Sequence, residues 1–186
     1  MKLPWRSRPQ TAESPEQDPS EDTGPRILTH QSPGLELALG EASHRESCRV
    51  LDLGPCVPEN LAVVTAFASR MQIVDAPGSW LSDRAPALAE PDGRIGDLRA
   101  LCPEFQASFN LILTWDVISY LSRGRAEDLM RVIAQLSRAD AHLHSIVHCS
   151  DTMPAVPARY RIVDEKYLAY EPITTEVRGT PDLPPC

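Results

Sequence analysis

The sequence predicts an α/β protein with a doubly wound, mostly parallel sheet and helices on both faces of that sheet. Three observations support this fold class. From residue 48 onward short apolar segments alternate with helical patterns, residues 109–114 form a continuous apolar run, and an amphipathic helix pattern follows that run. A continuous apolar run is typical of a strand buried on both faces. Strands that alternate with helices are joined by crossovers, which produce parallel sheets.

The first half of the predicted domain contains two helices and two strands. Ser32-Pro33 offers an N-cap followed by proline at the first helical position, which predicts a helix over residues 33–44. A short apolar strand follows at residues 49–53. Apolar side chains at helical spacing predict a helix over residues 60–70, and residues 71–74 form a second apolar strand.

The second half continues the alternation. A weaker helical pattern covers residues 79–89, where a proline interrupts it, and a short third strand is expected at residues 94–95. The fourth strand is the apolar run at residues 109–114. Ser122 can cap the helix that follows, whose apolar residues recur at i, i+3, i+4 and i+7. A fifth strand is expected at residues 141–149.

Two tails flank the domain, which we place at residues 33–171. Residues 1–32 combine prolines with acidic residues and hold little that could be buried, so we expect them to be disordered. Residues 172–186 form a second, proline-rich tail. Just before it, residues 160–163 and 167–171 have the pattern of a C-terminal β-hairpin.

Composition restricts the partners of the chain. With 186 residues, of which 42% are hydrophobic, it can bury one core. The formal net charge of −8 disfavours nucleic acid as a partner. No apolar stretch approaches the roughly 20 residues that span a bilayer, and no signal pattern opens the chain, so we expect a cytoplasmic protein without a membrane partner. The five cysteines lack paired spacing, which favours reduced thiols.

Polar residues follow several of the predicted strands. In a doubly wound sheet, ligands bind beyond the carboxyl ends of the strands, where the strand order reverses. The residues at these ends are Asp52, Gly54, Asp75, Asp97, Trp115 and Asp116. The carboxylate of Asp75, after the second strand, can accept hydrogen bonds from both hydroxyls of a ribose. The carboxylate of Asp97 can accept a hydrogen bond from an exocyclic amine such as that of adenine.

Four segments in this order resemble the class I S-adenosylmethionine-dependent methyltransferases. They are "RVLDLG", "MQIVD", "GDL" and "FNLILTWDVISYL", and the resemblance covers residues 48–149. It implies a Rossmann-like sheet, S-adenosylmethionine as the cofactor, and a methyltransferase-like domain over residues 33–171. The family has a seven-stranded sheet whose last two strands form an antiparallel pair.

The resemblance also implies roles for individual residues. Asp52 and Gly54 would lie at the amino-acid end of the cofactor, Asp75 at its ribose and Asp97 at its adenine. Trp115 and Asp116 would lie near the sulfonium and the methyl acceptor. The implied cofactor-binding set is Asp52, Gly54, Cys56, Asn60, Asp75, Asp97 and Trp115, and the candidate catalytic residue, for positioning the acceptor, is Asp116.

The loop after the first strand departs from the family pattern. Gly54 retains the first of three glycines, whereas Cys56 and Pro58 occupy the other two positions. Cysteine avoids positive φ, and proline removes one amide donor but is well tolerated as the first residue of a helix. Val57 is confined to extended geometry by the following proline. The amide of Asn60 can still face a ligand at the helix N-terminus.

Each candidate also has a structural interpretation. Asp75, Asp97 and Asp116 are residue types that often form turns or caps after strands, and Trp115 is equally suited to wall packing. His142, His144 and His148 would share one face of the fifth strand. Ligands on one flat strand rarely converge on a metal, so we interpret these residues as partly exposed strand histidines and predict no metal site.

Two functions follow from these patterns. The first is an S-adenosylmethionine-dependent methyltransferase acting on a small-molecule or protein acceptor. The alternative is a non-catalytic, methyltransferase-like binding or scaffold module that has lost cofactor binding, which the missing glycines favour. A nicotinamide-dependent dehydrogenase ranks behind both, because the chain lacks G-x-G-x-x-G.

Overall fold

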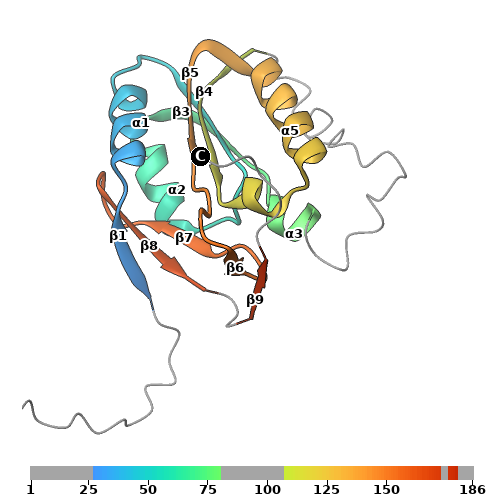
Figure 1. The fold of residues 1–186 in the computed structure, drawn as a ribbon. Helices are drawn as coiled ribbons and strands as arrows, with labels where there is room; N and C mark the ends of the chain where they lie inside the picture. Colours follow the sequence, from blue (N-terminus) through green and yellow to red (C-terminus); the bar gives the residue numbers. More distant parts are fainter. Residues whose placement is uncertain (1–26, 81–106, 173–175, 180–186) are drawn as a thin grey trace, which may run out of the picture.

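The computed structural model describes residues 27–80, 107–172 and 176–179 (Figure 1). Several predicted features lie outside these ranges. They are most of both tails, the helix at residues 79–89 beyond residue 80, the strand at residues 94–95, and Asp97.

Four parallel strands form the central sheet in the order β3-β2-β4-β5. Their bounds are β2 Cys48–Asp52, β3 Ala68–Ile73, β4 Phe109–Trp115 and β5 Ser137–Ser145. From β2 the chain passes to β3 on one side, and it later returns to β4 and β5 on the other side. The strand order therefore reverses between β2 and β4, which is where ligands bind in sheets of this kind.

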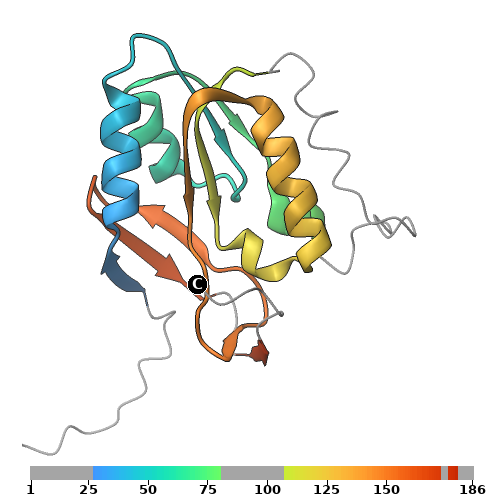
Figure 2. The same ribbon diagram turned by 45° about the horizontal axis from the view of Figure 1, so that its top comes forward.

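Helices cover both faces of this sheet (Figures 1 and 2). The long helices are α1 Pro33–Ser43, α2 Pro58–Thr65 and α5 Arg123–Leu136. Leu111 and Leu113 of β4 pack in one core with α1 and α2, while Ile112 packs in a second core with α5. Successive side chains of a strand point to opposite faces, so the continuous apolar run of β4 supplies both cores.

The remaining described elements are short. Helix α3 covers Ala76–Trp80, and the 3₁₀ helix η1 covers Val117–Tyr120. An antiparallel sheet has the order β1-β8-β7, from β1 Leu28–Gln31, β8 Tyr167–Glu171 and β7 Arg159–Ile162. A further antiparallel pair joins β6 Thr152–Pro154 to β9 Val177–Gly179. The two segments with the hairpin pattern are thus β7 and β8, which pair antiparallel.

Both predicted tail boundaries need correction. Leu28–Gln31, assigned to the N-terminal tail, form β1 and pair with β8. Val177–Gly179, assigned to the C-terminal tail, form β9 and pair with β6. In each case the backbone hydrogen bonds are made with a strand from a distant part of the chain. Local composition does not report such partners, and it therefore placed both segments outside the domain.

Two element boundaries also differ from the sequence prediction. The helix predicted for residues 60–70 ends at Thr65, because β3 begins at Ala68 opposite Cys48 of β2. The strand predicted for residues 141–149 runs from Ser137 to Ser145, since Ser137 already lies opposite Phe109 of β4. The predicted mixed α/β class, with a parallel sheet flanked by helices, is confirmed. No helix in the described ranges is long and apolar enough to cross a bilayer.

Candidate functional site at the carboxyl edge of the parallel sheet

Three of the predicted site residues meet where the strand order reverses. Asp52 is the last residue of β2, Trp115 is the last residue of β4, and Asp116 follows it. Because β2 and β4 are parallel neighbours, their carboxyl ends lie side by side at one edge. Asp75 follows β3 at the same edge.

Asp52 is a buried carboxylate that accepts two hydrogen bonds at one oxygen. Its Oδ1 accepts from the Gly54 amide at 2.8 Å and from Trp115 Nε1–H at 2.6 Å. The residue is 1% exposed. Burial raises the pKa of Asp52 to about 6, although the two hydrogen bonds act in the opposite direction. The carboxylate therefore holds the loop and the indole in place.

The indole of Trp115 fills the space beside Gly54. A Cβ added at Gly54 would lie 2.5 Å from Cδ1 and Nε1 of Trp115. The ring stacks on Tyr160 of β7, with centroids 5.7 Å apart and planes at 5°. Trp115 adopts a φ of 51°, a region that is uncommon for a bulky residue and that persists only when neighbours enforce it. In this arrangement the indole covers Gly54, which the sequence predicts at the amino-acid end of the cofactor.

Asp116 is fully buried behind this pair. Its Oδ2 accepts hydrogen bonds from Tyr160 Oη–H at 3.1 Å and from the Ala158 amide at 3.2 Å. Burial, reinforced by the Asp116 charge, holds the pKa of the Tyr160 phenol above its usual range, so the phenol stays protonated and donates. Because Asp116 is 0% exposed, its carboxylate does not reach the surface.

The structure adds two residues that the sequence analysis did not assign to the site, Tyr160 and His148. Tyr160 reaches the edge from β7, and His148 Nε2 lies 3.5 Å from Asp116 Oδ2. Nothing in the local pattern indicates either position. Tyr160 depends on how β7 docks, and His148 lies three residues beyond the end of β5.

The loop between β2 and α2 has the geometry that its proline predicts. Val57 is extended, with φ −109° and ψ 117°, and Pro58 opens α2, as expected. Cys56 is exposed. The sequence predicts that Asn60 offers its backbone amide to the cofactor. Its buried side chain is engaged by β7: Nδ2 donates to the Tyr160 carbonyl at 3.0 Å, and Oδ1 accepts from the Ile162 amide at 2.7 Å.

Asp75 has a different environment, because it is exposed. Its Oδ1 accepts a hydrogen bond from the Gly78 amide at 2.8 Å, so it forms a turn at the start of α3. The turn engages Oδ1 of Asp75, and the side chain remains exposed at the carboxyl edge of the sheet.

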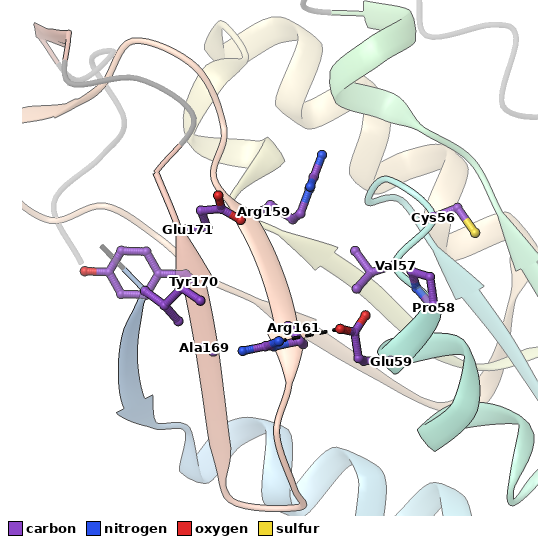
Figure 3. A pocket seen from close by; sticks show the side chains of 10 residues that line it. Cys56, Val57, Pro58, Glu59, Arg159, Arg161, Ala169, Tyr170 and Glu171 are labelled. Atoms are coloured by element: carbon purple, nitrogen blue, oxygen red, sulfur yellow. Dashed lines mark hydrogen bonds and ion pairs between the residues drawn. The ribbon is translucent and has the colours of Figure 1, made fainter. Parts of the chain in front are cut away.

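A cavity of about 260 Å³ lies on the other side of the loop, between α2 and the strands β7 and β8 (Figure 3). Arg161 of β7 and Glu59 of α2 form an ion pair across it, with Nη1 and Oε1 3.5 Å apart. Arg159 lies opposite Glu171 in the strand register. The cavity is below the roughly 300–1,000 Å³ of typical small-molecule sites, and the charges of Arg161 and Glu59 pair with one another.

The three histidines occupy different environments. His144 is 5% exposed, so the interpretation as partly exposed is wrong for this residue. Its Nε2 lies 3.2 Å from Ser32 Oγ. Burial is the main cause that lowers the pKa of His144 to about 4, and the charge of the neighbouring His30 lowers it further. The strand ends at Ser145, so His148 does not share its face. Among the described residues, no three His, Cys, Asp or Glu side chains are grouped to hold a metal ion.

These features define a mixed α/β protein with a four-stranded parallel sheet, flanking helices, and a buried polar network at the carboxyl edge. Comparison with protein-family models, with curated proteins and with solved structures finds no match for the chain.

Proposed function

We propose that this chain is an S-adenosylmethionine-dependent methyltransferase whose acceptor is a small molecule or a protein. The observation that carries the proposal is the position of Asp52 and Trp115, which end the two strands at the reversal of strand order. The order β3-β2-β4-β5 suits the centre of a doubly wound, Rossmann-like sheet. The motifs that resemble the family thus end at the edge where such sheets bind ligands.

The residues at this edge suit the cofactor if the indole of Trp115 moves. Gly54 has no side chain, so the space beside it is open to a ligand once the indole has left. The exposed carboxylate of Asp75 suits the two hydroxyls of a ribose. S-adenosylmethionine would supply an electrophilic methyl group, and the protein would contribute mainly the alignment of the acceptor with it.

Isothermal titration calorimetry with S-adenosylmethionine and S-adenosylhomocysteine tests the proposal. We expect binding of both, and tighter binding by W115A, because the indole no longer competes for the space beside Gly54. D75N should bind more weakly than the wild type, because an amide accepts fewer hydrogen bonds than a carboxylate. Absence of binding at millimolar ligand, for both the wild type and W115A, would overturn the proposal.

A second candidate is the non-catalytic, methyltransferase-like binding or scaffold module. The closed contact between Trp115 and Gly54 favours it, together with Cys56 and Pro58 at the glycine positions. In such a module the Trp115–Tyr160 stack is a permanent part of the core. W115A would then lose stability without gaining affinity for either ligand, which is the result that separates the two candidates.

A further inference from the structure

Asp116 is a buried carboxylate with one unsatisfied oxygen. Oδ2 accepts from the Tyr160 hydroxyl and the Ala158 amide, whereas Oδ1 is buried and has no hydrogen-bond partner. Leaving a buried polar atom unpaired costs roughly 1–3 kcal/mol, more when the group is charged. Such a cost is common where a charge is needed for chemistry rather than for folding.

His148 lies between this carboxylate and the surface. Its Nε2 is buried and faces Asp116 Oδ2 at 3.5 Å, while the side chain as a whole is 23% exposed. Two contacts hold the residue: its backbone amide donates to Ser119 Oγ at 3.2 Å, and its ring meets Tyr120 edge-on, with centroids 6.2 Å apart. The imidazole therefore joins the buried charge to the accessible side of the edge.

Of the groups in this network, His148 is the one suited to exchange a proton with a bound molecule. Asp116 is fully buried, and the Tyr160 hydroxyl donates its hydrogen bond inward to Asp116. A carboxylate that accepts a hydrogen bond from one imidazole N–H fixes the tautomer and leaves the other ring nitrogen as a base. The 3.5 Å separation is compatible with this role, because catalytic hydrogen bonds are often long without ligand and shorten in the complex.

We propose that His148 is the general base of the site and that Asp116 is the positioning residue behind it. The assignment rests on the proposed methyl transfer. Nδ1 of His148 takes the proton from an acceptor hydroxyl or thiol while the acceptor oxygen or sulfur forms its bond to the methyl carbon. The bond from that carbon to the sulfonium sulfur breaks, and its electron pair stays on the sulfur. The acceptor class is therefore a nucleophile that must lose a proton, such as a phenol or a thiol.

The tautomer of His148 tests this arrangement without any acceptor. Long-range ¹H–¹⁵N NMR, with the His148 signals assigned from H148N, should find the neutral ring protonated at Nε2. In D116N we expect loss of this preference, because an amide can donate to Nε2 instead of accepting from it. Y160F is the matched control, since it keeps the carboxylate and should keep the tautomer. A ring protonated at Nδ1 in the wild type would overturn the proposal.

Chemical reactivity provides a second readout that a merely structural histidine would not pass. At neutral pH, diethyl pyrocarbonate should modify His148 faster than the buried His144, and D116N should slow the modification of His148 several-fold. Mass spectrometry locates the modified residues. If D116N does not fold, as judged by circular dichroism, the wild-type tautomer and the His148-to-His144 rate ratio still decide, and a ratio of one or less contradicts the proposal.

Cofactor binding separates this proposal from the function on which it rests. H148N should bind S-adenosylhomocysteine as tightly as the wild type, because the base contacts the acceptor and not the cofactor. If neither protein binds this ligand while the tautomer and the reactivity are as expected, the methyl transfer fails and the His148–Asp116 pair stands. If both proteins bind it but His148 is protonated at Nδ1, the base assignment alone fails.

Discussion

The indole nitrogen of Trp115 donates a 2.6 Å hydrogen bond to Oδ1 of Asp52, and both residues are buried. The bond joins the carboxyl ends of two neighbouring parallel strands. It also holds the indole at 2.5 Å from the Cβ position of Gly54. The hydrogen bond therefore keeps the indole in the space beside Gly54. Variants of Gly54, Asp52, His144 and Asn60 test this arrangement and the residues around it.

Gly54 should not tolerate a methyl group. G54A places Cβ against the indole of Trp115, so we expect a loss of about 1–3 kcal/mol in the free energy of unfolding. Urea denaturation measures it. G40A is the matched control: Gly40 lies in α1 with no atom within 4 Å of its Cβ position, and helix propensity predicts a gain of about 0.5–1 kcal/mol. Additive losses in G54A/W115A would contradict the steric explanation, which requires a smaller loss for G54A in the W115A background.

Asp52 should stabilise the protein as the pH falls. Its pKa is raised to about 6 in the folded state, from 3.8 for the exposed group. The stability that Asp52 contributes is therefore complete below pH 3.8, the pKa in the unfolded chain, and is lost as the pH rises through about 6. The difference in unfolding free energy between the wild type and D52N should grow by about 2 kcal/mol in favour of the wild type between pH 7 and pH 4. Equal dependence of stability on pH in the two proteins would contradict a raised pKa of Asp52 in the folded state.

His144 should have the opposite effect. Burial lowers the pKa of His144 from 6.5 to about 4, so its contribution is complete above 6.5 and is lost as the pH falls through about 4. Between pH 7 and pH 4 the wild type should lose about 3 kcal/mol relative to H144Q. Thermal or urea unfolding at several pH values measures this difference. A wild type that instead gains stability relative to H144Q on acidification would exclude a buried, neutral His144.

Asn60 should be essential for the docking of β7. N60A leaves the Tyr160 carbonyl and the Ile162 amide without their side-chain partner, at an expected cost of about 2–4 kcal/mol. N110A is the control, because Asn110 is equally buried but accepts one hydrogen bond, from the Arg49 amide at 3.0 Å. It should cost less. Equal losses for N60A and N110A in urea denaturation would show that Asn60 contributes no more than local packing.

N60D sharpens the same test. Its carboxylate can accept from the Ile162 amide but cannot donate to the Tyr160 carbonyl, so two oxygens face each other in a buried position. Protonation restores the donor. We therefore expect N60D to recover stability relative to the wild type as the pH falls from 7 to 4, whereas N60A should not recover. Parallel pH profiles for N60D and N60A would contradict the assigned hydrogen bonds.

The local sequence pattern was sufficient to predict the positions of those strands and helices whose buried residues recur at a regular spacing. Strand β4 and helix α5 both lie where the sequence predicts them, because the spacing of their apolar residues alone shows which residues are buried. The caps were placed correctly but differ in detail. Ser32 precedes α1 and Ser122 precedes α5, yet neither side chain makes a capping hydrogen bond, and Ser32 Oγ lies near His144 instead.

The sequence by itself determined the mixed α/β class, with a parallel sheet flanked by helices, and the positions of Asp52, Asp75, Trp115 and Asp116 at strand ends. These follow from the alternation of strands and helices, which depends on burial periodicity within each segment. Only the tertiary structure decided that Trp115 covers Gly54, that Asn60 holds β7, and that His148 approaches Asp116. These contacts join residues between 32 and 102 positions apart, whose partners are set by the docking of β7 and of the segment after β5 rather than by local pattern.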